Sequence, residues 1–108
     1  MNGLKRYTPE AERWIRRALE LQPANLTLRG TLGSLLVELE QWDEGERVLR
    51  EVYANSEGDV DRGICSFYLA LVARQRGDLR NAARLAKRAR TIYPAPWLTE
   101  RIKDEFRL

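Results

Sequence analysis

The side chains that most often perform catalysis or bind metals are nearly absent from this sequence. It contains no histidine and a single cysteine, Cys65, among 108 residues. A Ser-His or Cys-His nucleophile pair and a zinc site of Cys and His ligands are therefore excluded, as is a disulfide within the chain. Carboxylate or lysine chemistry is left, but no acidic pair stands out from the charges of a solvated helix surface. We expect no enzyme activity, no cofactor and no metal site, and we expect Cys65 to be a buried structural thiol.

Arginine is the one residue type abundant enough to form a charged site. Lys and Arg together number 19, against 16 acidic residues, and the net charge is +3. The excess falls in residues 58–95, where a helix expected at 79–92 carries basic side chains at helical spacing: Arg80, Arg84, Lys87 and Arg88. Such a face is typical of a solvated surface, and the alternative is an electrostatic surface for nucleic acid or another polyanion. Because no base-stacking aromatic side chains alternate with these arginines, we do not favour nucleic acid as the partner.

The charged residues must be positioned by helices, which the apolar spacing predicts along most of the chain. Apolar residues recur at i, i+3, i+4 and i+7, and the clearest unit is residues 62–94: a helix, a turn at Gly77, a second helix and a stop at Pro94. Asn25 is placed to cap the second helix of the chain, and Asp59 or Asp61 the fourth. The three tryptophans are expected on apolar stripes, Trp14 and Trp42 at core positions and Trp97 at the start of a last helix.

The helices recur at regular offsets. In the second helix of each hairpin, a small residue recurs at offsets of 34 and then 37 residues. Apolar and small positions also match between the first helices of the hairpins. The matched sets are Ala11, Gly45 and Ala82, then Leu32 and Leu69, and Gly33 and Ala70. A period of this length indicates a repeat architecture, because one hairpin cannot bury its apolar face alone.

In this period, and in the small and large apolar residues at these positions, the chain resembles the tetratricopeptide repeat family. The resemblance covers about residues 8–94 and implies an all-α fold of about six helices, in antiparallel hairpins stacked as a short right-handed α-solenoid. A generic array of helical hairpins is the alternative. The implied divisions are a polar lead at 1–7, a half repeat at 8–23, repeats at 26–59 and 62–94, and a capping helix at 95–108.

The resemblance also implies a function, which is to bind another protein or peptide in a concave groove lined by the first helix of each hairpin. Carried onto this sequence, the groove positions are Thr27, Gly30, Ser34, Val37, Ile64, Phe67, Leu71 and Arg74. No apolar run approaches the roughly 18 residues that span a bilayer, and the N-terminus lacks the apolar region of a secretory signal. We therefore expect a non-catalytic interaction or assembly module in the cytoplasm, not inserted in a membrane.

Two questions stay open at the level of the sequence. The helix at 62–76 is apolar nearly all round, so either the C-terminal helix covers Ile64, Phe67 and Leu71 within the protomer, or these residues form an exposed patch that binds a partner helix or a second copy. The first helix lacks its expected mate. The chain is therefore either a piece of a longer array or a protomer that completes itself as a homo-oligomer.

Overall fold

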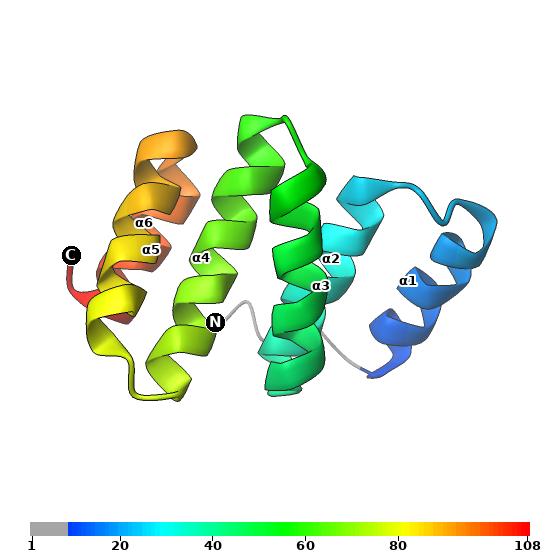
Figure 1. Cartoon of the computed structure of the whole chain (residues 1–108), viewed down its shortest axis with the longest axis horizontal. Helices are drawn as coiled ribbons and strands as arrows, with labels where there is room; N and C mark the ends of the chain where they lie inside the picture. The colour runs from blue at the N-terminus through cyan, green and yellow to red at the C-terminus, as the bar shows by residue number, and fades with distance from the viewer. Residues whose placement is uncertain (1–8) are drawn as a thin grey trace.

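The computed structural model describes residues 9–108, and all regular structure among them is α-helical (Figure 1). The helices are α1 (Pro9–Leu21), α2 (Leu26–Glu38), α3 (Trp42–Asn55), α4 (Asp59–Gln75), α5 (Leu79–Ile92) and α6 (Pro96–Phe106). The predicted all-α class with six helices is confirmed. The polar lead expected at residues 1–7 lies outside the described residues. Within the described range, no helix is long and apolar enough to cross a membrane.

The helices are arranged as packed hairpins. α2 packs against α3, and α4 against α5, each pair joined by a short turn (Figure 1). α4 also contacts both helices of the preceding hairpin, α1 packs on α2, and α6 packs on α5. The stack of helical hairpins is therefore present, whereas its right-handed superhelical path and its division into repeats stay predictions.

Each hairpin closes at the small residues that recur in the sequence. A Cβ atom on Gly33 would come within 2.8 Å of a side chain of the partner helix, and one on Gly45 within 2.9 Å. The equivalent positions in the second hairpin, Ala70 and Ala82, are buried. At Gly33 and Gly45 the paired helices therefore approach too closely to accept a larger side chain without a shift.

The helix ends follow local sequence signals, with one exception. The Asn25 side chain accepts a hydrogen bond at 3.0 Å from the backbone N–H three residues on, which confirms its predicted capping role. Gly77 has φ +82°, the left-handed conformation expected for the turn after α4. The predicted cap at Asp59 or Asp61 is wrong, because Gly58 is the N-cap residue and makes no side-chain cap. Both carboxylates lie instead in the first turn, where the helix dipole favours negative charge.

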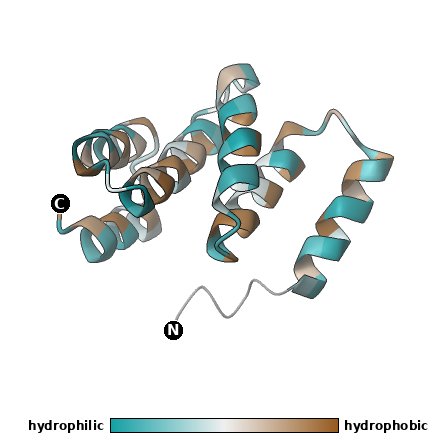
Figure 2. Ribbon diagram, turned by 60° about the horizontal axis from the view of Figure 1, so that its bottom comes forward, coloured by the Kyte–Doolittle hydropathy of each residue, from teal (hydrophilic) through white to brown (hydrophobic). Residues whose placement is uncertain are grey.

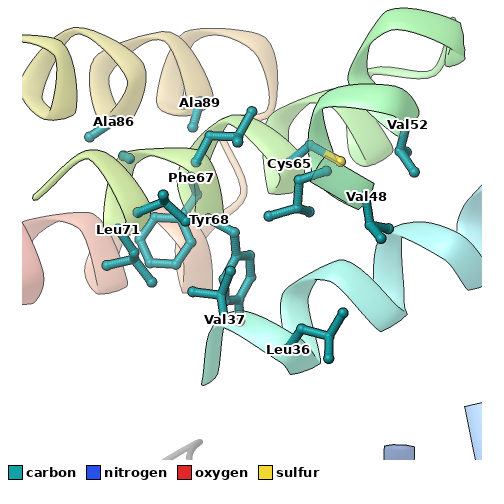
Figure 3. Close-up of a cluster of buried hydrophobic side chains, with 14 of the residues drawn as sticks. Leu36, Val37, Val48, Val52, Cys65, Phe67, Tyr68, Leu71, Ala86 and Ala89 are labelled. Atoms are coloured by element: carbon teal, nitrogen blue, oxygen red, sulfur yellow. The ribbon is translucent and has the colours of Figure 1, made fainter. Parts of the chain in front are cut away.

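The core is centred on α4. Residues 65–73 of this helix are all buried, so it is covered on every side rather than along one stripe. Figure 3 shows Phe67 and Leu71 between side chains of α2 and α5. On α6, Leu98 and Ile102 are fully buried and belong to the same cluster. By contrast, α1, α3 and α5 present hydrophobic residues on one side and hydrophilic residues on the other (Figure 2).

The three tryptophans differ in their environments. Trp42 packs against the core as predicted. Trp14 is 69% exposed, so its predicted core position is wrong. The reason is that α1 lies at the edge of the described stack and packs mainly on α2, with none of its residues buried. Trp97 is half exposed and meets Tyr93 edge to face, with ring centroids 6.3 Å apart.

The contact between α4 and the end of α5 gives a test at Gly63. A Cβ atom on this residue would lie 2.5 Å from the Cβ of Tyr93. Helix propensity alone favours alanine over glycine inside a helix by about 1 kcal/mol. We predict that Gly63→Ala instead lowers the free energy of unfolding by about 1–3 kcal/mol, the usual cost of overpacking, as measured by urea denaturation.

The matched control is Gly30→Ala in α2, where the new Cβ would lie 3.5 Å from Val52, an ordinary van der Waals contact. This variant should be as stable as the parent chain or more stable. Equal stability of the two variants would show that α4 and α5 do not approach each other as closely as described.

Candidate functional site

A groove of about 440 Å³ lies between α2, α4 and α6, and we call it the α2–α4–α6 groove. Its volume falls in the range of small binding pockets. The lining residues are Thr27, Gly30, Thr31 and Ser34 from α2, Val60, Asp61, Ile64, Cys65 and Tyr68 from α4, and Trp97 and Arg101 from α6.

The rim of the groove is partly apolar and exposed. Val60 is 48% and Trp97 49% exposed, although both are large hydrophobic side chains. In the same groove, the hydroxyl of Thr27 on α2 donates a hydrogen bond at 3.2 Å to the carboxylate of Asp61 on α4. The groove therefore combines apolar surface on two helices with a carboxylate on α4, which is the composition of a site that holds an apolar group and orients it by polar contacts.

Cys65 contributes to the lining without being a reactive group. The side chain is buried, as predicted from the sequence. Burial, with a smaller contribution from the charge of Asp61, raises the pKa of the thiol to about 12. The protonated thiol is the stable form at neutral pH, and it is the thiolate that acts as a nucleophile.

The structure divides the residues predicted to line the binding surface into two groups. Thr27, Gly30, Ser34 and Ile64 lie together in the groove. Val37, Phe67, Leu71 and Arg74 do not line it. Sequence reasoning missed Val60, Asp61, Trp97 and Arg101, which line it as well. The signal for Val60 was an apolar residue in the first turn of a helix, outside the buried stripe.

Phe67 is fully buried, so the hypothesis of an exposed patch around it is wrong. The alternative, cover by the C-terminal helix, is what the structure has. The ring of Phe106 meets the ring of Phe67 edge to face at 6.3 Å between centroids, and the guanidinium of Arg101 lies 5.1 Å from the Phe67 centroid. Val37 and Leu71 are buried beside it. These three side chains are not accessible to a partner in this conformation.

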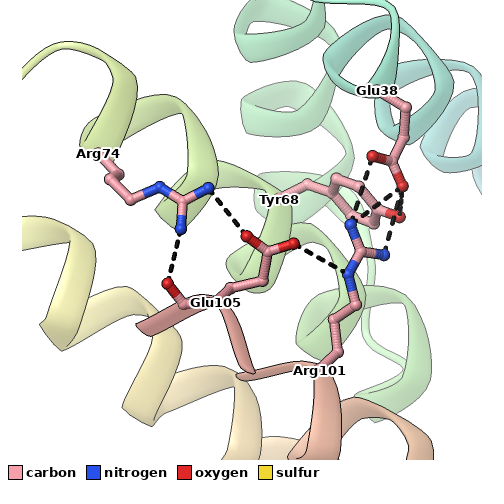
Figure 4. Close-up of polar contacts among 5 residues, drawn as sticks. All are labelled: Glu38, Tyr68, Arg74, Arg101 and Glu105. Atoms are coloured by element: carbon pink, nitrogen blue, oxygen red, sulfur yellow. Dashed lines mark hydrogen bonds and ion pairs between the residues drawn. The ribbon is translucent and has the colours of Figure 1, made fainter. Parts of the chain in front are cut away.

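Ion pairs hold α6 in this position (Figure 4). Arg101 donates to the Glu38 carboxylate at 3.3 Å, and the Tyr68 hydroxyl donates to the same carboxylate at 2.9 Å. Glu105 accepts from Arg101 at 3.3 Å, and Arg74 donates at 3.0 Å to its carboxylate and at 2.7 Å to its backbone carbonyl. We call these five residues the α6 ion-pair network. It joins α6 to both α2 and α4.

Within this network, Arg101 and Glu38 form the most buried pair. The side chains are 25% and 3% exposed. Burial alone would lower the pKa of Arg101, but Tyr68, Glu38 and Glu105 outweigh it, and the pKa of the guanidinium is raised above its ordinary value. Arg101 therefore stays charged, and it lines the groove while it holds α6 in place.

The predicted basic face lies exposed on α5, and its members are Arg80, Arg84, Lys87 and Arg88. Arg84 donates to Asn81, and Arg88 donates to the hydroxyl of Tyr53. None of the four forms an ion pair with another residue of the range 9–108. The positive charge of this face is therefore not neutralised by ion pairs, unlike that of Arg16 on α1 and of Arg47 and Arg50 on α3.

Comparisons with protein-family models, with curated proteins and with solved structures find no match to this chain. The likeness to tetratricopeptide repeats therefore depends on the recurring residues alone, and it stays a prediction.

The α6 ion-pair network gives a test at Arg101. Arg101→Ala removes the cation from a carboxylate that is almost completely buried. We predict that the free energy of unfolding falls by about 3 kcal/mol, at the lower end of the cost of breaking a buried ion pair, because the arginine itself is partly exposed. Urea denaturation followed by circular dichroism measures the change.

Lys103→Ala is the control on the same helix. Lys103 is exposed and pairs with exposed Glu100 at 3.6 Å, so its loss should change stability by less than about 0.5 kcal/mol. If both variants were equally stable, the contact between Arg101 and Glu38 would not be what holds α6 on the stack.

Proposed function

We propose that this chain is a non-catalytic protein-protein interaction or assembly module that binds a protein or peptide in the α2–α4–α6 groove. The observation that carries the proposal is the half exposure of Val60 and Trp97 beside the polar groups of the same groove. Large apolar side chains left open around a concave site are typical of binding surfaces. The resemblance to tetratricopeptide repeats, with its concave groove, supports the same function. The cytoplasmic location expected from the sequence stays part of this proposal.

The proposed mechanism is binding to a preformed groove. Gly33 and Gly45 hold α2 and α3 together closely, and the α6 ion-pair network fixes the wall that carries Trp97. Such a groove needs little ordering when a partner binds, which reduces the entropic cost of association. A volume of about 440 Å³ suits one or two side chains of a partner better than a whole helix. An apolar anchor residue would lie between Val60 and Trp97, with a donor of the partner directed at Asp61.

The alternative function is electrostatic binding of a polyanion by α5. The observation in its favour is that Arg80, Arg84, Lys87 and Arg88 form no ion pairs within the described range. Uncompensated charge attracts anionic partners over a distance set by the salt concentration. Nucleic acid is the less favoured polyanion, because base-stacking aromatics do not accompany these side chains.

The groove can be tested by site-specific photocrosslinking in cells. A benzoylphenylalanine at position 60 places the reactive group at the groove, while the same residue at Arg47 places it on exposed α3 outside the groove. We expect a crosslinked product of discrete mass from position 60 and none of that mass from position 47. Adding Trp97→Ala should reduce the product about tenfold, because truncating a large aromatic side chain at the centre of an interface typically lowers the affinity by that much or more.

Circular dichroism of each variant shows whether the helices are retained. Crosslinking to the same product from both positions, or a product unaffected by Trp97→Ala, would contradict binding in the groove.

A further inference from the structure

Two arginines converge on one tyrosine hydroxyl outside the groove. Arg62 of α4 donates from Nη2 at 3.3 Å, and Arg88 of α5 donates from Nη1 at 3.2 Å, to the Oη atom of Tyr53 on α3. Three helices therefore meet at this atom. The guanidinium of Arg62 also lies over the Tyr53 ring, 4.8 Å from its centroid, so its orientation is fixed.

The charges at this point are not balanced. Neither Arg62 nor Arg88 forms an ion pair within residues 9–108, and the phenol that they share is neutral in its ordinary state. The Nε atom of Arg62 is buried and has no hydrogen-bond partner in the structure. A buried donor without an acceptor is unfavourable, and two like charges brought to one atom repel each other. An anion beside Arg62 Nη2 and Arg88 Nη1 would offset the repulsion between the two guanidinium groups.

The excess positive charge also acts on Tyr53 itself. Burial alone would raise the pKa of this phenol, but hydrogen bonds from Arg88 and Arg62 outweigh it, and the pKa of Tyr53 is lowered below its ordinary value. The hydroxyl position is therefore one where negative charge is stabilised.

The donors suit one class of anion. Each guanidinium presents several N–H groups in a planar fork, which matches two oxygens of a carboxylate or phosphate. Because both forks approach the same point from different helices, a tetrahedral anion can bridge them, whereas a planar carboxylate offers its two oxygens in one plane. The Tyr53 hydroxyl can donate to a further oxygen.

We propose that Arg62, Arg88 and Tyr53 form a binding site for a phosphate group, carried either by the free ion or by a phosphorylated side chain. The site lies on helices α3, α4 and α5 and uses no residue that lines the α2–α4–α6 groove. It is therefore independent of binding in the groove, and either can fail without the other. Of the basic residues on α5, only Arg88 belongs to this site, while the others contribute general positive charge.

The test is a titration of the full chain with inorganic phosphate, at constant ionic strength maintained with chloride, followed by NMR of the arginine Nε–H groups. We expect saturable shifts for Arg62 and Arg88, and no saturable shift for Arg80, which lies exposed on the same helix as Arg88 without a contact to Tyr53. Equal, non-saturating drifts of all three signals, or no shift of Arg62, would overturn the proposal.

A second titration with O-phosphoserine separates the two sources of the group. If it saturates the same signals at an equal or lower concentration than inorganic phosphate, the site accepts a phosphorylated side chain. If only inorganic phosphate saturates them, the site takes the free ion. Either result supports the site, and failure of both ligands contradicts it.

Paired variants of equal net charge provide the control. Arg88→Gln removes one of the two bridging cations at an exposed position and should weaken phosphate binding at least about tenfold, the effect of losing a charge-assisted hydrogen bond. Arg80→Gln should change it less than about twofold. Equal weakening by both variants would mean that phosphate responds to the general charge of α5, and the proposed site would be rejected.

Discussion

The rest of the structure depends on the burial of α4. Its residues 65–73 are apolar or small on all sides, and a helix of this kind must be covered all round because every exposed face would leave hydrocarbon in water. The preceding hairpin of α2 and α3 covers one side, α5 covers the next, and α6 covers the last with Leu98, Ile102 and Phe106. The ion pairs of Arg101 and Arg74 then fix α6 at a point where apolar packing alone would leave its orientation less well defined.

The groove is a consequence of how far this cover extends. α4 has 17 residues and α6 has 11, so α6 buries Phe67 and Leu71 while Val60 and Ile64, nearer the start of α4, stay accessible. The walls that remain open are those of α2, α4 and the first turns of α6. Arg101 takes part in both roles, since it joins α6 to Glu38 and also lines the groove. Stability of the stack and shape of the candidate site are therefore coupled through one side chain.

Sequence patterns predicted the helices and the close contacts between them, because helical periodicity, capping by Asn25 and the recurring small residues such as Gly33 and Ala70 act locally or between adjacent helices. They did not decide whether α6 or a partner covers Phe67, since an apolar face indicates burial without naming what buries it. They placed Trp14 in the core, whereas in the structure this residue is exposed, because no other helix of the described range covers that side of α1. The pair of Glu38 with Arg101, 63 residues apart, and the meeting of Arg62 and Arg88 at Tyr53 depend on the tertiary positions of long side chains, which spacing along the chain does not encode.

The most direct measurement is a nuclear Overhauser experiment on the aromatic rings of the isolated chain. Phe67 is fully buried, and its ring lies edge to face against that of Phe106, 6.3 Å between centroids. The account predicts cross peaks between the ring protons of these two residues, and none between the Phe67 ring and water. Absence of the cross peaks, together with contact of the Phe67 ring with water, would show that α6 does not cover α4 and that the groove described between α2, α4 and α6 does not form.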